Sequence, residues 1–312
     1  MYPRALATTA ALVGALGMAQ AHQAGPPASS QAEPVFSAQS ELVVLQVMVE
    51  NRKGGYATDL TADAFTVLED GKPQTIAFFN RQDAPVTVGL LVDSSGSMQG
   101  VRNLVAAAAG TFVATSNPED EVFALTFSDD VRTALPASEP FTSDAVTLRA
   151  ALFDAISARG RTALYDALVN GLDYLGMGMH DRKVLIAVSD GGDNASKATY
   201  EQVLRQTQIS NTVIYTIVVS DPLESDANSG RLKRLAEASG GEAFEPKDVR
   251  DVPVVLQHIA RDVRNMYTIG YSPSQDKRAG LRRIRVTVEA PNHAALRVRT
   301  RQGYVVEKPK KR

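Results

Sequence analysis

Between residues 84 and 264, short apolar segments alternate with longer amphipathic ones, and this alternation limits the available folds more than any other feature. Residues 86–92 (VTVGLLV) are almost wholly apolar, as expected of a strand that is covered on both faces. Repeated strand–helix alternation predicts an α/β fold, a doubly wound and mostly parallel sheet with helices on both faces. We expect strands at 86–92, 121–127, 131–135, 183–188, 212–219 and 242–244, and helices at 98–115, 144–158, 163–177, 200–208, 230–238 and 252–264.

The segments on either side of this region predict short antiparallel strands. Asp70-Gly71 lies between two apolar runs, which is a strong hairpin signal. Each flank is close to the size at which a separate hydrophobic core becomes marginal. We therefore predict that residues 40–83 and 265–306 pair into one small β-domain, into which the α/β domain of residues 84–264 is inserted. Residues 307–312 form a basic tail.

The first residues predict an export signal. Arg4 provides a positive charge, an apolar run follows, and Ala19-Gln20-Ala21 supplies a small-x-small cleavage pattern. We expect a signal peptide at 1–21, cleaved after Ala21, and a flexible leader at 22–39. Cysteine is absent, so disulfides, thiolate metal sites and a lipid-modified cysteine are excluded. We expect no transmembrane segment after signal cleavage, and a secreted or periplasmic protein.

The formal net charge of −2 hides an asymmetry along the chain. Residues 265–312 hold 12 bases and 3 acids, whereas residues 22–264 hold 20 bases and 32 acids. An acidic body and an export signal argue against nucleic-acid binding. If the last strands pair, five arginines cover one side of their sheet, as either a solvated face or a docking surface for the acidic domain, an anionic polymer or the membrane surface. These are Arg283, Arg285, Arg297, Arg299 and Arg301.

Oxygen-bearing side chains follow the first buried strand. Asp93, Ser95 and Ser97 occupy alternating positions around Gly96, which we expect to let a tight turn close. Thr162 opens a predicted helix, and Asp190 ends another apolar strand. Ligands in open parallel sheets bind beyond the carboxyl ends of the strands. Hydroxyl and carboxylate oxygens suit a hard cation, and few carboxylates suit Mg²⁺.

The pattern Asp-x-Ser-x-Ser, a later Gly-x-Thr and a Ser-Asp-Gly resembles the von Willebrand factor type A (VWA) domain. The resemblance covers about residues 84–264 and implies a metal-ion-dependent adhesion site, in which a ligand carboxylate completes the coordination of the ion. Its five ligand positions are matched by Asp93, Ser95, Ser97, Thr162 and Asp190. The flanking segments, among them 64–71 and 267–273, look like a group of exported bacterial VWA-related proteins.

Other readings of these residues are weaker. A haloacid-dehalogenase-like phosphatase requires a second aspartate two positions after Asp93, where Ser95 stands. A serine hydrolase lacks its Gly-x-Ser-x-Gly elbow. Asp193 and Asn194 contribute either a rim to the site or a solvated turn. Asp-x-Ser-x-Ser alone is also compatible with a helix cap.

We therefore predict an exported, non-enzymatic binding protein that uses Mg²⁺, with Mn²⁺ or Ca²⁺ as alternatives, to recognise a carboxylate on a protein partner. The alternative is a scaffold of a cell-envelope assembly, in which the metal only stabilises the fold.

Overall fold

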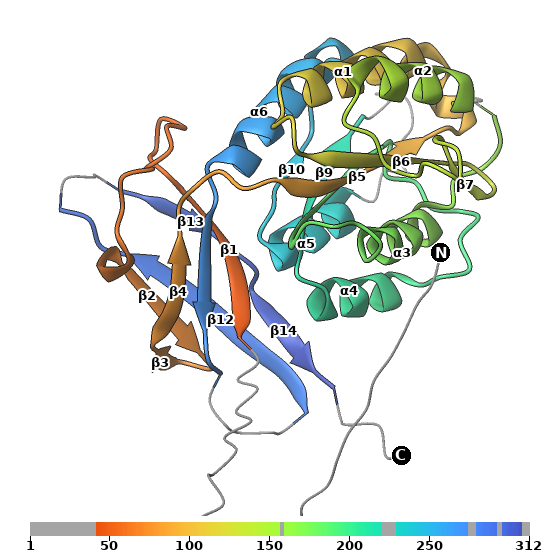
Figure 1. Ribbon diagram of the computed structural model, residues 1–312. Helices are drawn as coiled ribbons and strands as arrows, with labels where there is room; N and C mark the ends of the chain where they lie inside the picture. The colour runs from red at the N-terminus through yellow and green to blue at the C-terminus, as the bar shows by residue number, and fades with distance from the viewer. Residues whose placement is uncertain (1–41, 157–158, 220–228, 274–278, 292–294, 308–312) are drawn as a thin grey trace, which may run out of the picture. The chain divides into compact units, whose positions relative to one another are not determined.

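The computed structural model describes residues 42–156, 159–219, 229–273, 279–291 and 295–307. The predicted signal peptide, leader and basic tail therefore lie outside the described residues, apart from Glu307. Residues 40–312 form one compact unit. Within it, 14 strands and six α-helices are assigned among the described residues, and the strands form three sheets (Figure 1).

The largest sheet has six strands in the order β10-β9-β8-β5-β6-β7. Its neighbours are parallel except at β7, which runs antiparallel to β6. Every residue of β5 is buried, which explains its uninterrupted apolar sequence. The strands are β5 (Val86–Asp93), β6 (Glu121–Phe127), β7 (Val131–Thr133), β8 (Arg182–Ser189), β9 (Thr212–Val218) and β10 (Ala243–Phe244).

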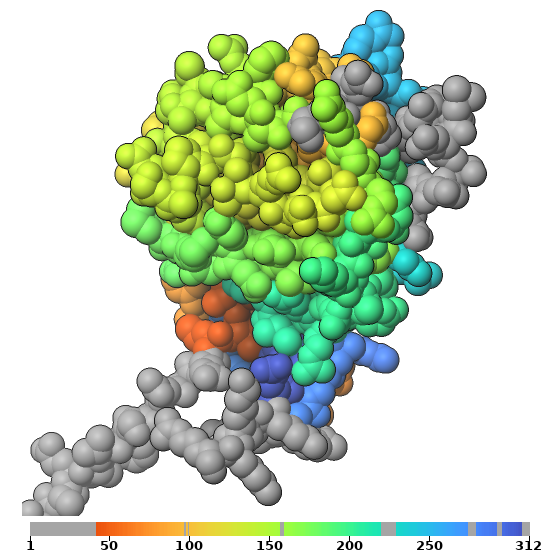
Figure 2. All heavy atoms as spheres, turned by 90° about the vertical axis from the view of Figure 1, so that its right-hand side faces the viewer, coloured from red at the N-terminus to blue at the C-terminus, as the bar shows by residue number. Residues whose placement is uncertain are grey.

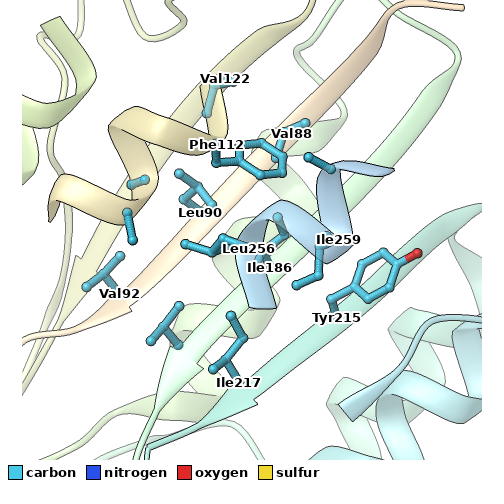
Figure 3. Packing of buried hydrophobic residues seen from close by; sticks show 14 of the residues in the cluster. Val88, Leu90, Val92, Phe112, Val122, Ile186, Tyr215, Ile217, Leu256 and Ile259 are labelled. Atoms are coloured by element: carbon cyan, nitrogen blue, oxygen red, sulfur yellow. The ribbon is translucent and has the colours of Figure 1, made fainter. Parts of the chain in front are cut away.

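Three helices cover each face of this sheet, so the predicted doubly wound fold is confirmed. On one face lie α1 (Arg102–Ala114), α2 (Ala145–Ala155) and α6 (Val252–Arg264), and their apolar side chains pack on those of β5 and β8 (Figures 1 and 3). On the other face lie α3 (Leu164–Leu175), α4 (Tyr200–Ile209) and α5 (Ser229–Ser239). The face of the molecule shown in Figure 2 is formed mainly by the segments from β6 to α4.

Gly171 lets α3 pack closely on the sheet. A Cβ atom added there would lie 2.9 Å from a terminal methyl group of Leu91 and 3.0 Å from one of Leu185, so an alanine would require these side chains to shift. At the start of α4, Thr199 and Gln202 form a capping box, which satisfies amide groups that the first helical turn leaves free.

The flanking strands are antiparallel, as predicted, and they form two sheets. The first has the order β13-β1-β11-β4 and the second the order β14-β12-β2-β3. Each sheet contains two strands from each flank. The two sheets contribute to one apolar cluster, in which the rings of Phe65 and Tyr267 lie 5.0 Å apart. The strands are β1 (Val43–Glu50), β2 (Phe65–Glu69), β3 (Lys72–Gln74), β4 (Ile76–Asn80), β11 (Tyr267–Tyr271), β12 (Gly280–Val288), β13 (Arg297–Arg299) and β14 (Gly303–Val306).

The chain leaves these sheets after β4 and returns to them at β11. The two strands are direct neighbours, with Asn80 opposite Thr268. Arg182 at the start of β8 reaches them, because its guanidinium donates to the Thr268 hydroxyl over 2.9 Å and to the Met266 carbonyl over 3.3 Å. The large sheet and the flanking sheets are therefore joined by buried polar contacts at this point.

Some boundaries differ from the sequence predictions. The helix expected at 98–115 is divided into the 3₁₀ helix η2 (Gly96–Gly100) and α1. Further 3₁₀ turns occur at η1 (Ala62–Ala64) and η3 (Val249–Asp251). β13 is only three residues long, because the chain turns after Arg299 to begin β14 at Gly303.

Candidate functional site

The candidate site lies at the carboxyl ends of β5 and β8, neighbouring parallel strands in the middle of the large sheet. From β5 the chain continues to β6 on one side, and it returns later to β8 on the other side. The order of connections therefore reverses at β5, which is where open α/β sheets bind their ligands.

Asp93, the last residue of β5, is fully buried. Its Oδ1 accepts a hydrogen bond from the backbone N–H of Ser95 over 2.8 Å, and its Oδ2 accepts one from the Ser189 hydroxyl over 2.7 Å. The Ser95 side chain also hydrogen-bonds to the carboxylate. Burial nevertheless raises the pKa of Asp93 to about 6, and the nearby Asp190 carboxylate adds to this increase.

The loop that carries Thr162 lies against the loop that follows Asp93. Two backbone hydrogen bonds join them, from Gly96 N–H to the Gly160 carbonyl over 3.4 Å and from Arg159 N–H to the Ser94 carbonyl over 3.0 Å. Thr162 itself is buried. This arrangement brings its segment to the same edge of the sheet as Asp93.

A glycine is required in this loop at position 160. Gly160 has a φ of +90°, and an added Cβ atom would lie 2.3 Å from the Asp129 carboxylate. Gly96, to which the sequence analysis assigned the tight turn, has nothing within 4 Å of an added Cβ atom. That expectation was wrong, because the constrained backbone belongs to the second loop.

The structure places the remaining predicted ligands as follows. Asp190 directly follows β8, and its Oδ1 accepts a hydrogen bond from the Gly192 N–H over 2.9 Å. The backbone of Ser97 belongs to η2, while its side chain lies outside the described part of the structure. Asp93, Ser95 and Asp190 are thus brought together by direct interactions, and Thr162 by the contacts of its loop.

Two further groups support the predicted ligands. Ser189 was not assigned from the sequence, and Asn194 was considered there only as a rim of the site or a solvated turn. The Ser189 hydroxyl donates to Asp93 and accepts a hydrogen bond from the Gly191 N–H over 3.1 Å, so it links the ends of β5 and β8. The Asn194 side chain accepts a hydrogen bond from the Thr162 N–H over 2.8 Å. Ser189 lies within the Ser-Asp-Gly motif, which was the available signal, but no local pattern pairs Asn194 with Thr162.

The chemistry of this group of residues suits a cation. Among the described residues, no Lys, Arg or His forms an ion pair with Asp93, although the side chain is fully buried. A buried carboxylate without a positive partner is unfavourable, and a hard cation held by carboxylate and hydroxyl oxygens removes that cost. The residues present therefore fit a divalent cation.

A second group of side chains is close enough to hold a metal ion but does not fit one. Ligand atoms of Glu50, His258 and Asp262 lie within 4.8 Å of one another. The guanidinium of Arg299 already lies 2.6 Å from the Asp262 carboxylate and 3.2 Å from that of Glu50. The Tyr56 hydroxyl donates a further hydrogen bond to Asp262 over 2.7 Å. This cluster carries its own cation, so it is an internal ion-pair network.

The predicted row of five arginines is corrected by the structure. The strands expected to pair are not neighbours, because β12 pairs with β14 and β2, whereas β13 pairs with β1. Arg299 and Arg301 are each 8% exposed, and the Arg301 guanidinium donates to the Gln208 carbonyl over 2.7 Å. Neither can contact an external surface. Only Arg283, Arg285 and Arg297 are exposed.

Within the described ranges, no helix is both long and apolar enough to cross a membrane.

Comparisons with known proteins agree with this fold. A sequence model of the von Willebrand factor type A domain matches residues 88–260. A search of curated protein sequences finds no significant match. A solved von Willebrand factor type A structure from Catenulispora acidiphila is similar with a TM-score of 0.50 at 14% identity, over 87% of this chain and 74% of that chain.

Two further solved structures are similar over a smaller part of this chain. An aerotolerance-related membrane protein from Bacteroides fragilis has a TM-score of 0.45 at 15% identity, over 57% of this chain and 98% of that chain. The von Willebrand factor domain of a type V pili tip protein from Porphyromonas gingivalis has a TM-score of 0.46 at 14% identity, over 57% of this chain and 95% of that chain.

Proposed function

Because the chain belongs to the von Willebrand factor type A domain family, we propose that it is a binding protein that recognises a protein partner through a bound divalent cation. The observation that carries this proposal is the buried Asp93 carboxylate, which lies beside Asp190 and among hydroxyl groups with no positive side chain paired to it among the described residues. Membership of the family makes a protein-interaction module the first expectation.

We assign the cation to five residues of the three loops. Asp93 and Asp190 supply negative charge, and hydroxyl groups supply the other oxygen ligands. Mg²⁺ is the ion expected, because it prefers oxygen ligands and few carboxylates, and Mn²⁺ or Ca²⁺ are alternatives. The proposed set is Asp93, Ser95, Ser97, Thr162 and Asp190.

An ion held by these residues would supply a positive charge to which an acidic group of the partner could bind. The chain's own residues determine how that charge is presented. Ser189 holds the Asp93 carboxylate in place, and Asn194 holds the backbone of Thr162. Hydrogen bonds of this kind orient the ligands. Specificity then depends on a partner carboxylate that reaches the site at one geometry.

We also propose that the protein acts without catalysis and outside the cytoplasm. No nucleophile and base pair was identified in the sequence, and residues 1–21 carry the pattern of a cleaved signal peptide. We also propose that the inserted α/β domain extends from residue 84 to residue 264. We keep the predicted contact between arginines and an anionic surface only for the exposed residues Arg283, Arg285 and Arg297.

The proposal is tested by cross-linking the exported protein to its neighbours in the cell envelope, in Mg²⁺ and in EDTA, and identifying them by mass spectrometry. Wild-type protein should yield partners that are lost in EDTA and in Asp93→Ala. Partners that persist in both conditions would favour the alternative, a scaffold in which the ion only stabilises the fold.

A further inference from the structure

The outer face of β12 forms the floor of a groove that the metal-site proposal does not use. One part of the groove has a volume of about 460 Å³, and a second part has about 370 Å³. Ile284, Arg285 and Gln302 line both parts, so the two are continuous. Gln208 of α4 and Ala238 of α5 form the opposite wall of the larger part.

Backbone contacts hold the two walls of the groove together. The Gln302 N–H donates to the Ala238 carbonyl over 3.1 Å, and the Ile284 N–H donates to the Gln302 carbonyl over 2.9 Å. Arg301, buried beneath, donates to the Gln208 carbonyl. The turn before β14 is thus fixed against the ends of α4 and α5. Figure 1 shows β14 on the side of the β-sheets that faces α4.

The larger part of the groove carries positive charge alone. Arg283 and Arg285 are the only ionisable residues among those that line it. Both are exposed, and among the described residues neither side chain forms a hydrogen bond or ion pair. Arg297, in the smaller part, is instead paired with Glu242 at 3.1 Å. The attraction for an external anion is therefore concentrated at Arg283 and Arg285.

The spacing of these two arginines matches an extended peptide. They occupy alternate positions of β12, so they project from the same face and are separated by about 7 Å. Alternate side chains of an extended segment have the same spacing. Leu281, which is 50% exposed, continues the row, and Leu68 lies beside Arg285 on β2. The groove therefore offers two positive positions beside apolar ones.

We propose that this groove binds an extended acidic segment of a partner protein, in which carboxylates at alternate positions pair with Arg283 and Arg285 and an apolar side chain contacts Leu281. A flat anionic membrane fits the concave floor less well. This surface is independent of the cation proposed above.

The experiment measures binding of a fluorescent peptide with the sequence Glu-Leu-Glu-Leu-Glu-Leu to the exported protein by polarisation, in EDTA. Peptide with glutamine in place of glutamate serves as the uncharged comparison. We expect saturable binding of the acidic peptide that weakens with added salt. The double variant Arg283→Gln/Arg285→Gln should weaken it at least tenfold, and Leu281→Ser should weaken it several-fold.

A charge-matched control is Arg52→Gln/Arg132→Gln, two exposed arginines that do not line the groove. Equal losses in both double variants would overturn the proposal, because the peptide would then respond only to net charge. Two results together would overturn the peptide proposal and assign the arginines to a non-peptide polyanion. The first is an unchanged peptide affinity in Leu281→Ser, and the second is tighter binding of the protein to phosphatidylglycerol vesicles or heparin than to the peptide.

Two further outcomes separate this proposal from the metal site. Asp93→Ala should bind the acidic peptide as wild type does, and loss of binding in that variant would place the peptide at the candidate cation site. Concentration-dependent dimerisation that is lost in Arg283→Gln/Arg285→Gln would identify the occupant as a second copy, and would overturn the peptide proposal.

Discussion

The hydroxyl of Ser189 donates a 2.7 Å hydrogen bond to the carboxylate of Asp93 and so joins the ends of two neighbouring strands, 96 positions apart in the sequence. The same hydroxyl accepts from the Gly191 N–H at the start of the next loop. One small side chain therefore positions both the central carboxylate of the candidate site and the loop that carries Asp190.

Replacing Ser189 should weaken cation binding. Ser189→Ala removes a buried hydrogen bond to a ligand carboxylate, and we expect a roughly tenfold to hundredfold loss of Mg²⁺ affinity. The free energy of unfolding in EDTA should fall by about 1–3 kcal/mol. Affinity is measured by calorimetric titration and stability by urea unfolding.

The matched control for this variant is Thr216→Val. Thr216 is fully buried in β9 of the same sheet, but its hydroxyl has no hydrogen-bond partner among the described residues. Its replacement should leave Mg²⁺ affinity unchanged. If both variants lose affinity equally, the effect of Ser189 belongs to the stability of the sheet and not to its bond with Asp93.

Removal of the charge at Asp93 should abolish cation binding without lowering the stability of the ion-free protein. In EDTA at pH 7 the difference between a pKa of about 6 and the usual 3.8 corresponds to about 3 kcal/mol of unfavourable burial. Asp93→Asn should therefore be at least as stable as wild type in EDTA. In wild type, an ion at a hundredfold its dissociation constant should add about 2.7 kcal/mol, which the variant should lack.

Thermal unfolding in EDTA, Mg²⁺, Mn²⁺ and Ca²⁺ measures both effects. A stabilisation by Mg²⁺ that survives in Asp93→Asn would show that the ion binds elsewhere. Asp181→Asn, an exposed aspartate, is the control for the change in net charge.

The two glycines of the candidate site should respond differently to alanine. Gly160→Ala places a Cβ atom against Asp129 at a φ of +90°, and we expect a cost of about 1–3 kcal/mol in unfolding free energy with a loss of Mg²⁺ affinity. Gly96→Ala meets no atom within 4 Å and should change stability by less than about 0.5 kcal/mol. The opposite ranking in urea unfolding would contradict the loop geometry described above.

The buried ion-pair network should depend strongly on Arg299. Arg299→Met leaves Glu50, Glu242 and Asp262 without their shared cation, and we expect a loss of about 3–5 kcal/mol in unfolding free energy. Arg297→Met removes one largely exposed ion pair and should cost less than about 1 kcal/mol. Urea unfolding compares the two, and equal costs would refute the assignment of the network to Arg299.

The sequence was sufficient for the large sheet because burial leaves a direct trace in composition. β5 is buried on both faces, so its segment is almost wholly apolar. The polar residues that end the apolar segments of β5 and β8 indicated the position of the candidate site. The pairing of Asn194 with Thr162 was not predictable, because it joins two loops by a single side chain 32 positions away.

The arginines show where a periodic pattern is insufficient. Arg297, Arg299 and Arg301 alternate along the chain as a surface row would, yet Arg299 is buried among carboxylates from β1 and α6. Its neighbours are set by which strands pair, and that depends on contacts more than 200 positions apart, such as Met48 opposite Arg299. A buried arginine with distant partners has the same local sequence as an exposed one.

Because β4 and β11 are neighbouring antiparallel strands, the large inserted domain takes the place that a hairpin loop would have between them. Asn80 and Thr268 would be opposite each other with a two-residue turn between the strands or with a whole domain there. The entropy of closing such a loop grows only with the logarithm of its length. The length of the insert therefore adds little to the cost of pairing β4 with β11, and the buried contacts of Arg182, Arg299 and Arg301 fix this particular domain against the β-sheets.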